Sequence, residues 1–291
     1  MVEDRSFGGR LFSIVNYALL GIIALVSFLP FVHVIAGSFT TGAELAVKKF
    51  VLIPTVWSFD AYRFIFSTNA IFRAMLVSVL VTLIGTAFSM LISSMMAYGL
   101  ARRDLDGRRF IMFAVVFTML FNGGLIPTFL VVKELGLVDQ YAALVLPIAV
   151  NAFNMIILKN FFQNIPDGLE ESAKIDGCSD WGILFRIVLP LSLPALATIS
   201  LFYAVTYWNT YLNAILYLDS SSKWPIQVLL RQIVVLASGF EFGSSLDNEV
   251  PPPDQSVKMA VIVVATVPIL LVYPFLQKHF AKGALLGSIK G

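Results

Sequence analysis

The chain has few charged residues, a single cysteine and two histidines. Asp, Glu, Lys and Arg together make up 13% of its 291 residues, against the ~25% usual in soluble domains. Hydrophobic residues make up 58%. One globular core cannot bury so much apolar surface, so the composition excludes an ordinary soluble domain. It predicts an all-α, polytopic membrane protein.

The scarcity of cysteine and histidine excludes several kinds of chemistry. Cys178 has no disulfide partner and no nearby base, so it indicates neither an oxidising compartment nor a nucleophile. His33 and His279 are far apart in the chain and have no other ligand types at metal-binding spacing. No P-loop pattern is present, so we expect no ATP bound by this chain. The sequence therefore predicts a protein that is not an enzyme, with no metal and no cofactor of its own. The net charge of +2 is too small to suggest a nucleic-acid partner.

Apolar stretches separated by polar segments predict six transmembrane helices in one domain covering residues 1–291, since each crossing takes ~20 residues. The predicted spans are 11–37, 72–100, 110–129, 141–162, 192–218 and 258–279. Between and after them we expect a polar hairpin at 164–194, an outer loop at 219–257 and a short basic tail at 280–291. Pro30 should kink the first span, and Asn122-Gly123-Gly124 interrupts the third.

The distribution of Lys and Arg predicts the orientation. If the N-terminus is inside, the cytoplasmic side carries twelve of the twenty basic residues: Arg5, Arg10, Arg102, Arg103, Arg108, Arg109, Lys159, Lys174, Arg186, Lys278, Lys282 and Lys290. The remainder are spread over longer outer segments. Positive residues near span ends favour the inside, so we expect both termini and the hairpin in the cytoplasm.

The polar stretch 164–194 is typical of two short helices that meet at a turn. Asp167 can cap the start of the first helix. Gly177 suits a left-handed residue at its end. A Ser-Asp pair then favours a second helix, which Pro190 interrupts. A rigid hairpin of this kind, fixed between spans, is well suited to docking on another protein.

This hairpin resembles the EAA loop of ABC-importer permeases, the coupling helix that the ATPase subunit grips. The family pattern is E-A-A, three residues, G, nine residues and I-x-L-P, and the matching residues are Glu171, Ala173, Gly177, Ile187, Leu189 and Pro190. Ser172 departs from the usual Ala. The resemblance implies an ATPase-coupling set of Glu170, Glu171, Ala173, Asp176, Gly177, Leu189 and Pro190.

The C-terminal stretch from Tyr273 to Gly291 resembles carbohydrate-importer permeases related to the maltose system's second permease, and more closely the LplC-like group. In that family the tail can reach the interface between the two ATPase subunits. The resemblance implies contacts by Lys282, Gly287, Lys290 and Gly291. The alternative is a basic end that lies beside lipid headgroups.

The resemblance also implies partners and a location. A type I importer permease would form a heterodimer with a second permease in the bacterial inner membrane, among membrane lipids. Two ATPase subunits would bind ATP and Mg, and an extracytoplasmic binding protein would deliver the substrate. An oligosaccharide from a polysaccharide is the expected substrate, with an acidic one such as alginate a candidate.

Two other classes compete with the importer. A secondary sugar transporter driven by an ion gradient would need carboxylates near the middle of the spans, whereas here Asp and Glu fall in loops or near span ends. A purely structural membrane scaffold is the third class.

Aromatic and amide side chains gather on the fifth predicted span. Tyr203, Tyr207 and Tyr211 recur at i, i+4 and i+8, so they share a helical face, and Trp208 and Asn209 lie beside it. Such residues suit the lining of a sugar path. They equally suit helix packing, with Asn209 bonded to a neighbouring span.

The outer loop offers a second candidate surface. Its accessible residues are expected to be Phe240, Glu241, Phe242, Asp247 and Glu249. The related permeases use this region to reach the binding protein. The alternative is a lid on the outer membrane surface.

Overall fold

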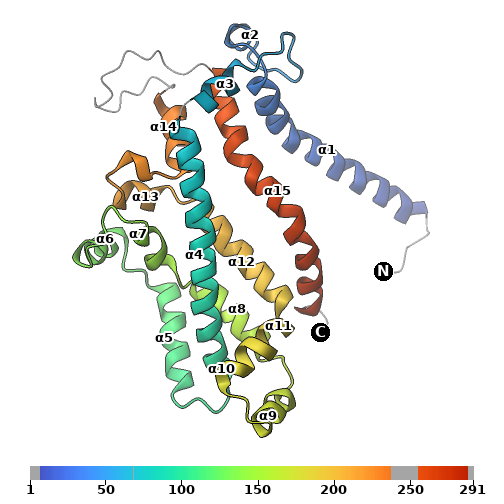
Figure 1. The fold of residues 1–291 in the computed structure, drawn as a ribbon. Helices are drawn as coiled ribbons and strands as arrows, with labels where there is room; N and C mark the ends of the chain where they lie inside the picture. Colours follow the sequence, from blue (N-terminus) through green and yellow to red (C-terminus); the bar gives the residue numbers. More distant parts are fainter. Residues whose placement is uncertain (1–6, 68, 237–254, 288–291) are drawn as a thin grey trace. The chain divides into compact units, whose positions relative to one another are not determined.

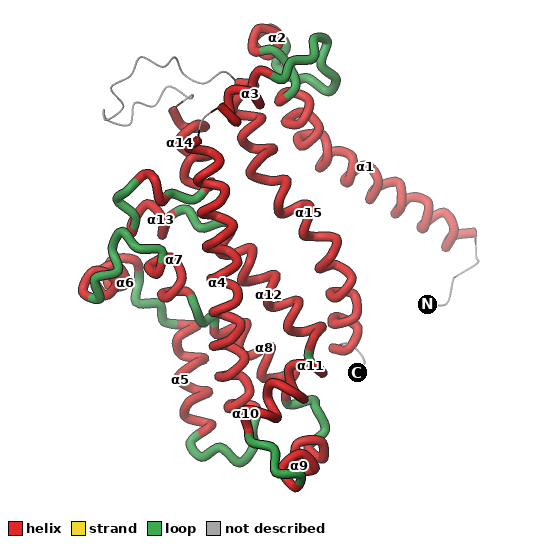
Figure 2. Tube along the Cα trace, viewed as in Figure 1, coloured by secondary structure: helices red, strands yellow, loops and turns green. Residues whose placement is uncertain are grey.

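The computed structural model describes residues 7–67, 69–236 and 255–287 (Figure 1). Regular structure within these ranges is helical, and no β-strand occurs there (Figure 2). One isolated bridge pairs Thr40 with Trp57. The described chain divides into two compact units, residues 1–69 with 230–266, and residues 70–229 with 267–291.

The first unit is built on the long helix α1. Its helices are α1 (Phe7–Ser38), α2 (Gly42–Val47), α3 (Asp60–Ser67), the second part of α14 (Ile226–Leu236) and the first part of α15 (Gln255–Gly287). Helix α1 continues through Pro30 and leaves the side chains of its apolar window uncovered. Its last residues pack against Leu45, Val51 and Met259. This unit thus presents a helix whose surface is suited to lipid or to another subunit.

A carboxylate organises the loop after α2. The Glu44 carboxylate accepts hydrogen bonds from the Thr55 hydroxyl at 2.6 Å, from Lys48 Nζ at 2.9 Å and from the Thr55 and Val56 N–H groups at 3.0 and 3.1 Å. These bonds, led by the Thr55 hydroxyl, lower the pKa of Glu44 to about 2. The loop is therefore an ordered element.

The second unit contains α4 and a series of broken helices. The bounds are α4 (Asn69–Ala101), α5 (Arg108–Leu120), α6 (Leu125–Glu134), α7 (Ala142–Val145), η1 (Leu146–Ile148), α8 (Ala152–Phe162), α9 (Asp167–Ile175), α10 (Asp180–Ile183), the π-helix η2 (Leu184–Val188), α11 (Leu189–Leu191), α12 (Leu193–Trp208), α13 (Leu212–Tyr217) and η3 (Ser221–Lys223). Helix α14 (Ile226–Leu236) runs from this unit into the first, and the second part of α15 also belongs to the second unit.

The described residues contain three helices long and apolar enough to cross a membrane, and up to six spans if each bent pair counts as one. The bends are 115° between α5 and α6, 56° between η1 and α8, and 87° between α11 and α12. This agrees with the six predicted spans. Broken helices are tolerated at membrane depth where protein or a water-lined cavity satisfies the free backbone groups.

Three segments differ from the predicted bounds. The third span is interrupted as predicted at Asn122-Gly123-Gly124, because Gly124 has φ +88°, which a continuing helix does not allow; its second helix runs to Glu134, beyond the predicted end at 129. The 192–218 span is interrupted after Trp208, with Asn209 at the C-cap. The last helix runs from Gln255 to Gly287, so the first part of the expected tail is helical, since no proline follows Pro274 to end it.

The core of the second unit lies where α4, α8 and α12 pack together. Small buried residues on α4, including Gly85, Ser89 and Ser93, let α12 approach closely. A Cβ built on Gly85 would lie 2.8 Å from ring atoms of Tyr207. Only glycine fits at this contact.

Candidate functional site

The hairpin of residues 164–194 forms two helices joined by a glycine corner. Helix α9 ends before Gly177, which has φ +79°. The Cys178 N–H donates to the Ala173 carbonyl at 2.9 Å, the bond that closes a Schellman turn. Ser179 then caps α10 by accepting the Gly182 N–H at 3.3 Å. Local capping chemistry therefore fixes the angle between the two helices.

The second helix of the hairpin leads into α12 through an irregular stretch. Helix α10 continues as the π-helix η2 and then as α11, which carries Pro190. The chain turns at Ser192, where α12 starts at 87° to the preceding helix. A π-helix is rare and frequently marks a functional site. This irregular stretch connects the hairpin to α12.

The predicted coupling residues lie mainly on the outside of the hairpin. Glu171, Asp176, Gly177 and Pro190 are exposed, while Glu170, Ala173 and Leu189 are half-buried. Ile175 is 86% exposed. Trp181 and Phe185 are also exposed, and their rings stack with centroids 6.3 Å apart. Exposed apolar side chains beside charged ones are typical of a protein docking surface.

A polar hollow of about 310 Å³ opens between the end of α4 and the hairpin. Its charged lining comprises Arg102, Arg103, Asp104, Asp167, Glu170, Glu171 and Lys174. Burial raises the pKa of Glu170, which outweighs the opposing effect of Arg102 and Lys174. Glu170 thus faces a partly desolvated site in which a cationic partner would stabilise its charged form.

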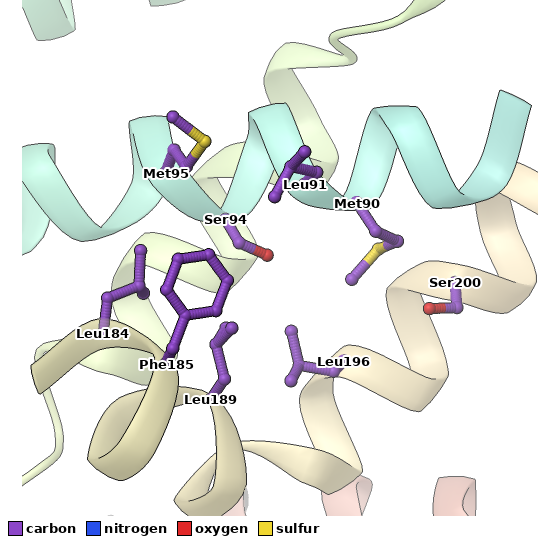
Figure 3. Close-up of a pocket in the computed structure, with 9 residues that line it drawn as sticks. All are labelled: Met90, Leu91, Ser94, Met95, Leu184, Phe185, Leu189, Leu196 and Ser200. Atoms are coloured by element: carbon purple, nitrogen blue, oxygen red, sulfur yellow. The ribbon is translucent and has the colours of Figure 1, made fainter. Parts of the chain in front are cut away.

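An apolar hollow of about 330 Å³ lies where the second helix of the hairpin meets α4 and α12 (Figure 3). Helix α4, the π-helix, α11 and α12 line it with Met90, Leu91, Ser94, Met95, Leu184, Phe185, Leu189, Leu196 and Ser200. Phe185, Leu189 and Leu196 point into the same space as Met90 and Ser94. Two serines give too few polar groups for a sugar, so this hollow does not fit a carbohydrate site.

Two tyrosines predicted for the substrate path lie in the packed interior. Tyr203 and Tyr207 are each 1% exposed. The Tyr203 hydroxyl is 2.7 Å from Ser93 Oγ and accepts the Asn151 N–H at 3.0 Å. The Tyr207 hydroxyl is 2.7 Å from Ser89 Oγ and donates to the Val145 carbonyl at 3.3 Å. Trp208 is also buried.

In this structure Tyr203, Tyr207 and Trp208 are buried inside the subunit, so their place in a substrate path stays a prediction. A buried phenol needs a hydrogen-bond partner, and serines on α4 supply it, so the tyrosine face turns toward α4. Asn209 also differs from the packing alternative, because its amide donates to the Val205 carbonyl of its own helix at 2.8 Å. Asn209 is exposed and Tyr211 half-buried. Of the five predicted residues, these two keep accessible surface.

The remaining predicted contacts fall at the edge of the described chain or beyond it. Lys282 and Gly287 lie in α15, where the backbone alone is described. Lys290 and Gly291 lie outside the described residues, as do Phe240, Glu241, Phe242, Asp247 and Glu249 of the outer loop.

Cysteine labelling should separate the accessible residues from the packed ones. After Cys178 is changed to Ala, Asn209→Cys should react with a water-soluble thiol reagent, because its side chain is exposed at the break between α12 and α13. Tyr203→Cys should be protected in the same complex. Equal labelling of both variants would contradict the packing shown by the hydroxyl bonds. Mass spectrometry of the labelled chain provides the measurement.

Comparison with known proteins identifies the family to which this architecture belongs. Residues 89–285 match the family described as "Binding-protein-dependent transport system inner membrane component". The permease protein YtcP of the Bacillus subtilis polygalacturonan/rhamnogalacturonan transport system is 70% identical over 97% of this chain and 99% of its own. Protein LplC of Bacillus subtilis is 53% identical over 97% of this chain and 96% of its own.

A solved structure gives the same result for the fold. In the crystal structure of a bacterial ABC transporter involved in the import of the acidic polysaccharide alginate, one chain is 34% identical, with a TM-score of 0.86 over 94% of this chain and 98% of that one. The family match covers well over half of the chain, and the similarities extend over nearly all of it. The chain therefore belongs to the inner-membrane components of binding-protein-dependent transport systems, the permeases of ABC importers.

Proposed function

We propose that this chain carries an acidic oligosaccharide, released from a uronic-acid polysaccharide, across the cytoplasmic membrane. The observation that carries the proposal is the 70% identity, over nearly the full length, with a permease named for polygalacturonan and rhamnogalacturonan transport. The likeness to an alginate importer supports it, since polygalacturonan and alginate are both polymers of uronic acids. Membership of the importer family excludes the ion-gradient transporter and the structural scaffold as classes.

The working complex would contain this chain, a second permease, two ATPase subunits that bind ATP and Mg, and an extracytoplasmic binding protein. Both termini and the 164–194 hairpin would lie in the cytoplasm, as the Lys and Arg distribution favours. The exposed apolar residues of the hairpin, Ile175 above all, support its use as the ATPase contact. We infer that Glu170 and Glu171 contribute charge to that contact.

The C-terminal part of α15 would complete this contact. The tail, with Lys282, Gly287, Lys290 and Gly291, would reach the interface between the ATPase subunits. Helix α15 continues to Gly287, and a helical stem is better suited than a loose end to carry a tail away from the membrane. Contact of the lysines with lipid headgroups is the alternative.

The substrate path of this subunit would pass the break between α12 and α13. There Asn209 offers an amide for sugar hydroxyls and Tyr211 an aromatic face for a pyranose ring. Neither side chain is cationic, so neither forms an ion pair with a uronate. We therefore assign recognition of the sugar's charge to other parts of the complex.

Uptake by a deletion strain tests the substrate class. A strain that lacks this chain should fail to deplete oligogalacturonides from the medium, and the intact gene should restore depletion. Neutral malto-oligosaccharides of equal length serve as the control and should be consumed equally by both strains. A deletion strain that still takes up oligogalacturonides but no longer takes up the malto-oligosaccharides would contradict the proposal. Chromatography of the medium provides the measurement.

A further inference from the structure

Arg102 joins the end of α4 to the hairpin. Its guanidinium donates to both carboxylate oxygens of Asp104, at 3.1 and 2.9 Å, and also to Asp180, the first residue of α10. It lies 5.9 Å from the centre of the Tyr98 ring. One side chain thus connects α4, the loop that follows it and the second helix of the hairpin.

The burial of Arg102 separates it from the other basic residues nearby. Its side chain is 17% exposed, whereas that of Arg103 is 74% exposed and approaches Asp167 only to 3.8 Å. Exposed ion pairs contribute little to stability, and the side chains of Asp104 and Asp180 are 68% and 63% exposed. The guanidinium itself is partly buried and bonds both carboxylates, which gives it a defined geometry. Arg102 is therefore suited to hold the loop after α4 against the hairpin, and Arg103 is not.

Hydrogen bonds also join α4 to the residue that follows α8 and to α12. Gln163 donates to the Ala101 carbonyl at 3.1 Å. Farther along α4, Ser89 and Ser93 bond the hydroxyls of Tyr207 and Tyr203. A displacement of the hairpin that reaches α4 therefore also reaches α12 through these bonds.

The covalent route from the hairpin to α12 is bent. It passes through the π-helix and the 87° turn at Ser192. The Ser192 hydroxyl is buried and has no hydrogen-bond partner among the described residues. The backbone holds the turn, since the Ser192 N–H donates to the Val188 and Leu189 carbonyls at 3.1 Å and the Ser192 carbonyl accepts the Leu196 N–H at 2.9 Å.

We propose that Arg102 is a positioning residue that fixes the hairpin to α4, so that α4 and α12 move together when the hairpin moves. The proposal rests on the proposed function of the hairpin as the ATPase contact. It assigns the transmission of that movement to the ion pair of Arg102 with Asp180 as well as to the chain itself.

The test uses the whole importer in proteoliposomes and measures substrate transported per ATP hydrolysed. Arg102→Gln should lower this ratio by roughly threefold to tenfold, while the ATPase subunits still copurify and still hydrolyse ATP. Arg102→Lys should give an intermediate ratio, because an ammonium keeps the charge but cannot bond several carboxylate oxygens in a fork. A general loss of folding would instead lower assembly and both activities together.

Neutral variants of the partners identify the bond that matters. Asp180→Asn should lower the ratio as Arg102→Gln does, and the two effects should be less than additive, since both variants remove the Arg102–Asp180 bond. Each variant also removes a contact of its own, the 3.9 Å approach of Lys174 to Asp180 or the bonds of Arg102 to Asp104. Asp104→Asn should have a smaller effect, because Asp104, like Arg102, belongs to the loop after α4, so its bond does not reach the hairpin. Arg109→Gln is the charge-matched control; its side chain is exposed, and the described residues include no polar contact to it.

The results separate the two proposals. Normal coupling in Arg102→Gln, or fully additive effects of Arg102→Gln and Asp180→Asn, would overturn the role of Arg102 and leave the hairpin's role standing. A wild-type complex whose ATPase subunits do not bind the hairpin in crosslinking would overturn the proposed function itself. If Arg102→Gln does not assemble, Asp180→Asn decides: a complex with a normal ratio overturns the proposal, and a lowered ratio supports it.

Discussion

Gly177→Val is expected to abolish coupled transport while the permease still inserts and assembles. Gly177 has φ +79°, and the left-handed conformation costs a residue with a side chain about 1–2 kcal/mol, a factor of roughly 5 to 30 in the population of the corner. Branching at Cβ adds to this cost. We therefore expect the angle between α9 and α10 to be lost. Uptake and substrate-stimulated ATP hydrolysis in proteoliposomes are the measurements.

A matched pair of alanine variants isolates the backbone effect. Gly177 and Gly168 both have open space around a built Cβ, but Gly168 lies in helix α9 without positive φ. Gly177→Ala should therefore lower coupled uptake, whereas Gly168→Ala should leave the corner unchanged and favour the helix. Equal activity of Gly177→Ala, Gly177→Val and wild type would show that the corner does not control coupling.

Gly85→Val is expected to have the largest effect on folding. A Cβ at this position would lie 2.8 Å from Cε1 and Cζ of Tyr207, whose ring is held by hydroxyl bonds to Ser89 and Val145. The ring cannot turn away without breaking these bonds. Overpacking of a core typically costs about 1–3 kcal/mol, and the lost bonds would add to this. The measurement is the thermal unfolding temperature of the purified complex in detergent, with the yield of membrane-inserted chain.

Gly99 on the same helix provides the control. Apart from its chain neighbours and the adjacent backbone of its own helix, no described atom lies within 4 Å of a Cβ built there. Gly99→Val should therefore unfold close to the wild-type temperature. If Gly85→Val and Gly99→Val had the same stability, the close contact of α4 with α12 would not exist in the folded protein.

The parts of the fold that local chemistry determines could be predicted from the sequence. The apolar stretches predict up to six spans, and the helix, glycine corner and second helix of the hairpin follow from Gly177 and Ser179, which act on their immediate neighbours. The predicted roles of these residues in coupling stay predictions.

The orientation of the tyrosine face could not be predicted. A repeat at i and i+4 indicates a face, but Ser93 and Ser89, which are 110 and 118 residues from Tyr203 and Tyr207, decide what it contacts. Arg102 and Asp180 are likewise 78 residues apart. Contacts at such separations leave no local pattern. A run of small hydroxyl residues on one predicted span and tyrosines on another was the one available signal.

The hydroxyl bonds between α4 and α12 have an electrical consequence. Between Ala74 and Ala101 on α4, and throughout α12, no residue carries a charge. Each elementary charge moved across the membrane gains or loses ~2.3 kcal/mol per 100 mV, but serine and tyrosine hydroxyls carry none. Within these bounds, movement of the helix pair carries no side-chain charge through the membrane voltage. We therefore expect the work of moving these two helices to come through their packing contacts and not from the voltage.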